Sequence, residues 1–153
     1  MFVMYEFELF KGEEFYIAAP FDFGGGATQG ETLQEVEQNA AYWLKTSLDG
    51  YLIHGKSFPE PTYGNKPQHS GTILLIGVET GKEFIRRMSA ADAARALGVT
   101  RGRVSQLIKA GMLDTFDLNG RTWVTTDSVE ARLADPPRIG RPRKNKDSAE
   151  QPA

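Results

Sequence analysis

Apolar and polar side chains alternate at the start of the chain, which predicts a β-hairpin. Residues 1–10 are rich in aromatic and β-favouring types, and Glu6 and Glu8 alternate with apolar neighbours. A short turn and a second apolar run at 15–19 complete the hairpin. We expect both glutamates on the solvated face, because one face of an antiparallel sheet commonly meets water.

An amphipathic helix follows a glycine-containing loop at 20–30. Thr32 and Glu35 have the spacing of a capping box, in which each residue's side chain bonds a free N–H of the first turn. Apolar residues then recur at helical spacing from Leu33 to Leu48. Gly50 is expected to end the helix.

A proline-containing extended loop at 57–67 and a β-branched strand at 71–80 come next. A strand with such an apolar run is typical of the inside of a sheet or of an interface between copies. The segment Ile73–Val78 and the helix that carries Trp43 are therefore candidates for a homo-oligomer interface.

Two short helices joined by a glycine turn are predicted in the second half of the chain. Ser89 caps a helix that ends at Leu97, and Thr100 caps a second helix over 101–110. Gly98 suits the left-handed position that follows a helix.

A second hairpin and a last helix follow. Residues 116–124 contain Asn-Gly, a strong signal for a two-residue turn. Asp127 and Glu130 are expected to cap a helix that runs to about residue 133. Residues 135–153 are rich in Pro, Arg and Lys with almost no apolar side chains, which predicts a disordered basic tail.

Charge divides the chain near residue 80, although the total is only −2. Residues 1–80 hold four lysines and 11 acids, a balance of −7. Residues 81–153 hold 14 lysines and arginines and nine acids, a balance of +5. This asymmetry predicts two modules, a basic one that faces nucleic acid and an acidic one that faces a basic partner.

Composition excludes several kinds of chemistry. The 153 residues include no cysteine, so disulfides, cysteine–zinc sites and thiol catalysis are excluded. His54 and His69 lack metal-ligand spacing and are expected at the surface, so we predict no metal and no catalytic residue. Residues 25–32 have P-loop spacing, but Glu31 stands where the phosphate-binding lysine belongs, so no nucleotide cofactor is expected. No apolar run is long enough for a membrane span and no signal peptide begins the chain, so a cytoplasmic location is expected.

Three residues in the second half have the spacing of a helix-turn-helix. Ala94 supplies the small residue where two helices cross, Gly98 the turn, and Val104 an apolar contact after it. The segment Met88–Leu133, with its hairpin as the wing, resembles the winged helix-turn-helix of excisionase-like and MerR-like regulators. A helical hairpin that binds protein is the alternative.

If 101–110 is the recognition helix, its exposed side enters the major groove, where Arg can pair with guanine and Gln with adenine. Arg121 in the wing is expected to position the DNA backbone. The tail contains Gly-Arg-Pro flanked by arginines, which resembles an AT-hook; a solvated basic tail is the alternative. The predicted DNA-binding residues are Thr100, Arg101, Arg103, Gln106, Lys109, Arg121, Arg141 and Arg143.

The stretch YIAAPFDFGGGATQGETLQEV at 16–36 resembles the HicB antitoxin family. A strand, a Pro/Asp/Gly loop, Thr-x-Gly-x-Thr and Leu-x-Glu lead into an amphipathic helix, and Phe-Pro-Glu-Pro at 58–61 matches the family's proline-rich exit from that helix. The resemblance covers about residues 3–65. It implies a partial RNase-H-like α+β domain without nuclease activity, and a small basic RNA-cleaving toxin, HicA-like, as partner. The −7 balance suits a partner that normally binds polyanionic RNA.

We therefore predict an α+β protein in three parts: a HicB-like toxin-binding domain at 1–80, a winged helix-turn-helix DNA-binding domain at 84–134 and a disordered basic tail at 135–153. The predicted function is that of a type II antitoxin, oligomeric and non-enzymatic, that sequesters its toxin and represses its own operon. One alternative is a stand-alone transcriptional regulator. The other is an RNase-H-like nuclease, which a metal-dependent nuclease assay would reveal.

Overall fold

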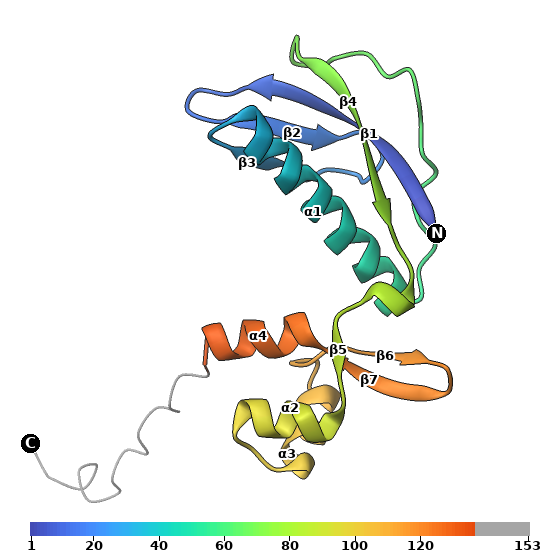
Figure 1. Cartoon of the computed structure of the whole chain (residues 1–153), viewed down its shortest axis with the longest axis vertical. Coiled ribbons are helices and arrows are strands. Elements are labelled where there is room, and N and C mark those ends of the chain that lie inside the picture. Colours follow the sequence, from blue (N-terminus) through green and yellow to red (C-terminus); the bar gives the residue numbers. More distant parts are fainter. Residues whose placement is uncertain (137–153) are drawn as a thin grey trace, which may run out of the picture. The chain divides into compact units, whose positions relative to one another are not determined.

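A computed structural model describes residues 1–136 (Figure 1). These residues form two antiparallel sheets and four α-helices, which confirms the α+β class. The predicted tail from residue 137 on, with Arg141 and Arg143, lies outside the described residues. No helix within residues 1–136 has both the length and the apolar character that crossing a membrane requires.

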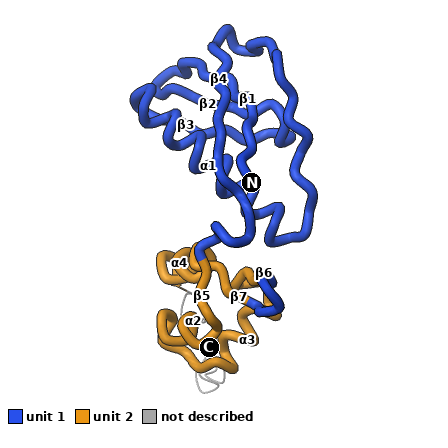
Figure 2. The backbone as a smooth tube through the Cα atoms, turned by 45° about the vertical axis from the view of Figure 1, so that its right-hand side comes forward, with its two compact units in different colours: residues 1–86, 116–122 blue, residues 87–115, 123–153 orange. Residues whose placement is uncertain are grey.

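The chain divides into two compact units, shown in Figure 2. Among the described residues, the first comprises 1–86 and 116–122, and the second comprises 87–115 and 123–136.

One four-stranded antiparallel sheet and a long helix make up most of the first unit. The strand order is β3-β2-β1-β4, so β1 lies in the middle and β4 at an edge. The elements are β1 (Phe2–Lys11), β2 (Tyr16–Pro20), β3 (Thr28–Gly30), α1 (Leu33–Ile53), β4 (Thr72–Glu79) and a 3-10 turn, η1 (Lys82–Phe84). The predicted hairpin at the start of the chain, β1–β2, is confirmed.

The core of this unit lies between α1 and one face of the sheet. Alternate residues of β1 point to that face, and every fourth residue of α1 points back, as the two periodicities require. The buried residues are Tyr5, Phe7, Ala18, Val36, Ala40, Leu44 and Leu48. Burial of a large apolar side chain contributes about 1.5–3 kcal/mol, so these contacts between α1 and the sheet stabilise the unit.

Helix α1 begins as predicted and ends later than predicted. The Thr32 hydroxyl accepts from Glu35 N (3.1 Å), while the Glu35 carboxylate accepts from Glu31 N (3.4 Å). The prediction that Gly50 ends the helix is wrong, because α1 continues to Ile53. Glycine inside a helix costs about 1 kcal/mol relative to alanine, and packing offsets this cost. The ring of the next residue, Tyr51, lies edge-on to Phe23 and Phe58.

Among the described residues, β4 pairs only with β1, in a continuous antiparallel register from Phe2↔Glu79 to Leu9↔Thr72. Of the two places predicted for this strand, the inside of a sheet is therefore wrong, and an interface between copies stays a prediction. Leu75, at its centre, is 52% exposed. Its apolar composition needs another explanation than burial inside the first unit.

The second unit is built from short elements around a compact core. Its elements are β5 (Arg87–Met88), α2 (Ala90–Leu97), α3 (Arg101–Lys109), the end of β7 (Arg121–Thr125) and α4 (Thr126–Ala134). The hairpin residues 116–122, which include most of β6 (Thr115–Leu118), group with the first unit. The three strands form a sheet in the order β5-β7-β6. The buried core residues are Ala93, Ala94, Val104, Leu107, Leu113, Val124 and Val129.

Most predicted boundaries in this region are confirmed, and one cap is wrong. The hydroxyls of Ser89 and Thr100 accept from Asp92 N and Arg103 N, each as an N-cap. Helix α4 is capped by Thr125, whose hydroxyl accepts from Ser128 N, and not by Asp127. Strand β7 runs directly into α4, so the last residue of the strand takes the cap position.

Candidate functional site

Helices α2 and α3 are joined by a tight turn that depends on Gly98. This residue has φ 67° and ψ 34°, the left-handed conformation that glycine adopts without steric cost. Val99 N donates to the Ala94 carbonyl oxygen (3.0 Å), which closes the end of α2. Ala94 and Val104 are both buried in the core of this unit. Gly98 therefore lies in the turn between the two helices, and Ala94 and Val104 lie in the core on either side of that turn in the sequence.

Helix α3 has a buried face and an exposed face. Val104 and Leu107 are buried, and Ile108 packs against them, as predicted. The exposed face carries Thr100, Arg101, Arg103, Gln106 and Lys109. Five of the eight predicted DNA-binding residues thus lie together on one helix and its cap.

Two hydrogen bonds orient the polar groups on this face. The Thr100 hydroxyl caps the helix by accepting from Arg103 N (3.1 Å). The Arg103 guanidinium donates from Nη1 to Gln106 Oε1 (3.1 Å), one turn along. This bond leaves the Gln106 amide NH2 and the remaining guanidinium N–H groups as hydrogen-bond donors on side chains of the exposed face.

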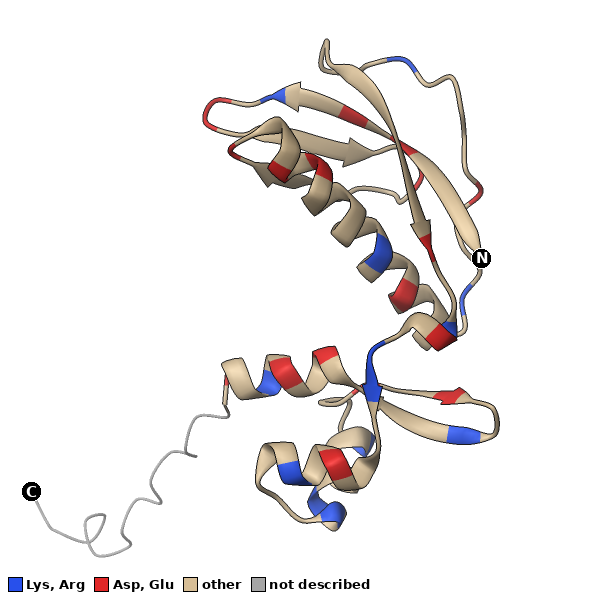
Figure 3. Ribbon diagram, in the orientation of Figure 1, with Lys and Arg blue, Asp and Glu red and all other residues tan. Residues whose placement is uncertain are grey.

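The charges on α3 itself are of one sign. Residues 101–109 contain three basic residues, Arg101, Arg103 and Lys109, and no acidic residue, whereas Arg95 on α2 is paired with Asp92. Figure 3 shows Lys and Arg in blue on α3 with no acid on that helix. Two of the arginines lie in the first turn, where the helix dipole is also positive. The local field therefore attracts an anionic ligand.

The other predicted DNA-binding residues lie elsewhere in the chain. Arg121 is exposed and follows a turn in which Asn119 (φ 53°) and Gly120 (φ 76°) both have positive φ, as the predicted tight hairpin turn requires. Residues 116–122 group with the first unit, where Lys82 Nζ donates to the Asp117 carbonyl oxygen (3.1 Å).

The prediction for Glu6 and Glu8 is wrong. Their side chains lie on the sheet face opposite α1, as the alternation indicated, but this face is covered by the loop after α1. Glu6 is 8% and Glu8 2% exposed. Alternation tells which side chains share a face, and it does not tell what packs over that face.

The Glu6 carboxylate binds one half of the covering loop. Oε1 accepts from Gly64 N (2.8 Å), and Oε2 accepts from Asn65 N (3.0 Å) and Asn65 Nδ2 (2.9 Å). These bonds hold the pKa of Glu6 below its ordinary value of 4.5, with Gly64 N–H having the largest effect.

The Glu8 carboxylate binds the other half of the loop. It accepts from Gln68 N (2.6 Å), His69 N (2.7 Å) and Gly71 N (3.0 Å). Burial is the largest single influence on the pKa of Glu8 and raises it, but the three N–H groups and the His69 ring together lower the pKa below 4.5. The loop at 62–71 thus donates backbone hydrogen bonds to two carboxylates and not to a neighbouring strand. We call these contacts of Glu6 and Glu8 with the loop the loop clamp.

The loop clamp could have been inferred from one signal in the sequence. A long loop without regular structure leaves backbone N–H groups that need acceptors when they pack against a sheet. Two carboxylates on the neighbouring strand face are such acceptors. His69, expected as a plain surface histidine, has an exposed side chain but contributes its backbone N–H to this clamp.

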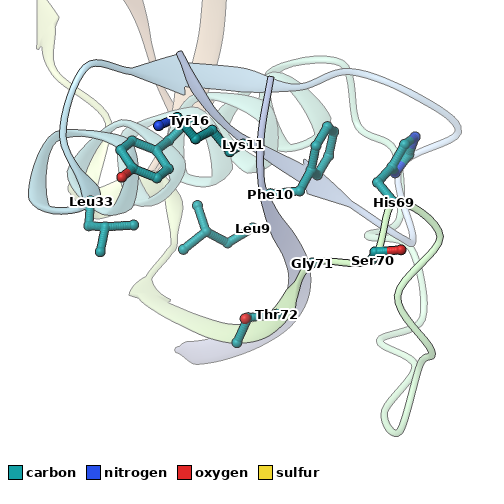
Figure 4. Close-up of a pocket in the computed structure, with 9 residues that line it drawn as sticks. All are labelled: Leu9, Phe10, Lys11, Tyr16, Leu33, His69, Ser70, Gly71 and Thr72. Atoms are coloured by element: carbon teal, nitrogen blue, oxygen red, sulfur yellow. The ribbon is translucent and has the colours of Figure 1, made fainter. Parts of the chain in front are cut away.

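A shallow hollow of about 390 Å³ lies beside the end of this clamp (Figure 4). The His69 ring stacks on Phe10 at 4.2 Å between centroids, and Lys11 Nζ lies 5.6 Å from the centre of the Tyr16 ring. Across residues 1–136, no group of three or more histidines and carboxylates is arranged to hold a metal ion.

Comparison with known proteins gives little. No protein-family model matches the chain, and no curated protein matches it. A chain from a toxin–antitoxin complex of Streptococcus pneumoniae is similar over 72% of this chain and 99% of its own length. The TM-score is 0.47 and the identity 17%, a level of likeness from which we draw no functional conclusion.

Proposed function

We propose that this protein is an antitoxin that also regulates transcription. The unit that contains α2 and α3 binds operator DNA as a winged helix-turn-helix. The first unit binds and sequesters a small basic RNA-cleaving toxin. Both roles are binding roles, and the proposal assigns no catalytic residue.

The observation that carries the DNA-binding role is the exposed face of α3. A recognition helix must be held firmly by the rest of its domain, must carry polar groups that can reach base edges, and must present positive charge to the phosphates. The buried side chains of Val104 and Leu107 and the turn at Gly98 hold α3 in this way. Arg103 and Gln106, already hydrogen-bonded to each other, supply donors suited to guanine and adenine edges.

Operator binding is tested with the full chain and the DNA upstream of its own gene. Arg103→Ala is expected to weaken specific binding by about 1–3 kcal/mol if the side chain reads a base. Arg101→Ala is expected to flatten the dependence of log affinity on log salt by about 0.9 if the side chain contacts one phosphate. Arg132→Ala, on α4, is the matched control. Unchanged affinity in both α3 variants would overturn the assignment.

The toxin-binding role is supported by charge and by the HicB-like stretch. Of the 11 acids among residues 1–80, Glu6 and Glu8 are used inside the unit. Many of the others are exposed, including Glu13, Glu14, Glu31, Glu35, Glu37 and Glu60. An acidic surface of this kind attracts a basic protein at long range.

The partner is tested by co-expression with the short reading frame next to the gene. The full chain is expected to restore growth and to co-purify with the product of that frame. The double variant Arg101→Ala/Arg103→Ala is expected to restore growth equally while it loses operator binding. Operator binding without any toxin binding would indicate a stand-alone regulator and would overturn the antitoxin half of the proposal.

A further inference from the structure

We propose that the free edge of β4 pairs antiparallel with β4 of a second copy, so that two first units form one continuous sheet. This inference goes beyond DNA binding and toxin binding and depends on neither. It concerns the first unit alone.

The first observation is an edge strand without the usual protection. β4 pairs with β1 through eight consecutive residues, with no bulge in the register, and has no strand on its other side among the described residues. Natural edge strands are commonly short, charged, kinked or interrupted by proline, because each device blocks further pairing. Residues 72–78 contain neither a charge nor a proline. The edge is therefore built in a way that permits another strand to add.

The second observation is an exposed apolar surface that reaches this edge. Phe2, Met4 and Leu75 lie on the sheet face opposite α1 and are 58%, 39% and 52% exposed. The Phe2 ring covers Gly77, where an added Cβ would lie 2.4 Å from its Cζ atom. The clamped loop covers Glu6 and Glu8 farther along the same face and leaves this part open.

Charge identifies a second copy as the occupant. Residues 1–80 carry a balance of −7, so two copies repel each other over most of their surfaces. The run from Thr72 to Val78 is uncharged, so like-charged copies can approach there without this penalty. A basic toxin would gain nothing from charge at the same place. The acidic residue of β4, Glu79, lies at the end of the strand and forms an ion pair with the N-terminal ammonium (3.3 Å).

Strand geometry makes this contact self-complementary. An antiparallel pair formed by one strand with its own copy has a twofold axis perpendicular to the sheet, and each contact occurs twice. Residues that face away from α1 then lie opposite residues of the same kind. With the axis near Leu75, the two apolar surfaces join across it and both α1 helices lie on the other face.

The test measures the mass of the full chain by light scattering over a range of micromolar concentrations, without DNA or toxin. The wild-type protein is expected to be a dimer. Leu75→Lys is expected to weaken dimerisation by at least about tenfold, because it places two like charges together at the paired edge. Tyr42→Lys, on α1 at a residue that is 70% exposed, is the matched control and is expected to dimerise as the wild type does.

A second measurement serves if Leu75→Lys does not fold. The chain has no cysteine, so Leu75→Cys and Tyr42→Cys each carry a single thiol. A short bis-maleimide is expected to cross-link the position-75 variant quickly and the position-42 variant slowly. A wild-type monomer at every concentration, a Leu75→Lys dimer of wild-type affinity, or equal cross-linking of the two cysteine variants would overturn the proposal.

Discussion

Replacement of Glu8 by alanine tests the loop clamp directly. The side chain is 2% exposed and accepts three backbone hydrogen bonds at 2.6, 2.7 and 3.0 Å. A hydrogen bond to a charged group contributes about 1.5–3 kcal/mol. The donors come from a surface loop, and water can take over part of their bonding once the carboxylate is gone. We therefore expect Glu8→Ala to lower the free energy of unfolding by about 2–4 kcal/mol, less than the sum of three such bonds.

The conservative variant refines this expectation. Glu8→Gln keeps one acceptor oxygen of the same shape but loses the charge and the second acceptor, so a cost of about 1–2 kcal/mol is expected. Glu13→Gln is the control, because Glu13 is exposed in the β1–β2 turn, and surface changes of this kind stay within about 0.5 kcal/mol.

Urea denaturation followed by tryptophan fluorescence provides the assay. The chain has two tryptophans, Trp43 in the first unit and Trp123 in the residues that group with the second. In a Trp123→Phe background the signal reports the first unit alone. Hydrogen exchange is expected to show faster exchange of the N–H groups at 64–71 in the alanine variant. If Glu8→Ala costs no more than Glu13→Gln, the carboxylate does not hold the loop and the reasoning fails.

Two further predictions concern acid and the α2–α3 turn. The pKa values of Glu6 and Glu8 lie below 4.5 in the folded protein, so their contribution to stability is complete above about pH 4.5 and is lost as the pH falls through the folded-state values. Acid titration of stability should therefore be steeper for the wild type than for Glu6→Gln/Glu8→Gln, and parallel curves would argue against the clamp. Gly98→Ala should destabilise the second unit by about 1–2 kcal/mol, because alanine at φ 67° meets the left-handed backbone penalty although no atom lies within 4 Å of its Cβ. Calorimetry measures this change, and an unchanged melting temperature would contradict it.

The sequence by itself determined most of the local structure. Thr32, Ser89 and Thr100 cap their helices through N–H groups three residues away, and Asn119-Gly120 turns its hairpin. Each of these signals depends on bonds between residues close in the chain, so it can be read without knowing what packs nearby. The buried and exposed faces of α3 follow from the same kind of periodicity.

Only the tertiary structure decided how those elements are covered. Glu6 and Glu8 meet N–H groups 58 to 63 residues away, and no local pattern reports such a partner. Tyr51 packs against Phe23 and Phe58, which keeps α1 helical past Gly50. Strand β4 is an edge strand because of the order of strands in the sheet, and a strand's composition does not determine that order. Burial depends on the sum of contacts from distant parts of the chain, whereas caps and turns depend on the nearest few residues.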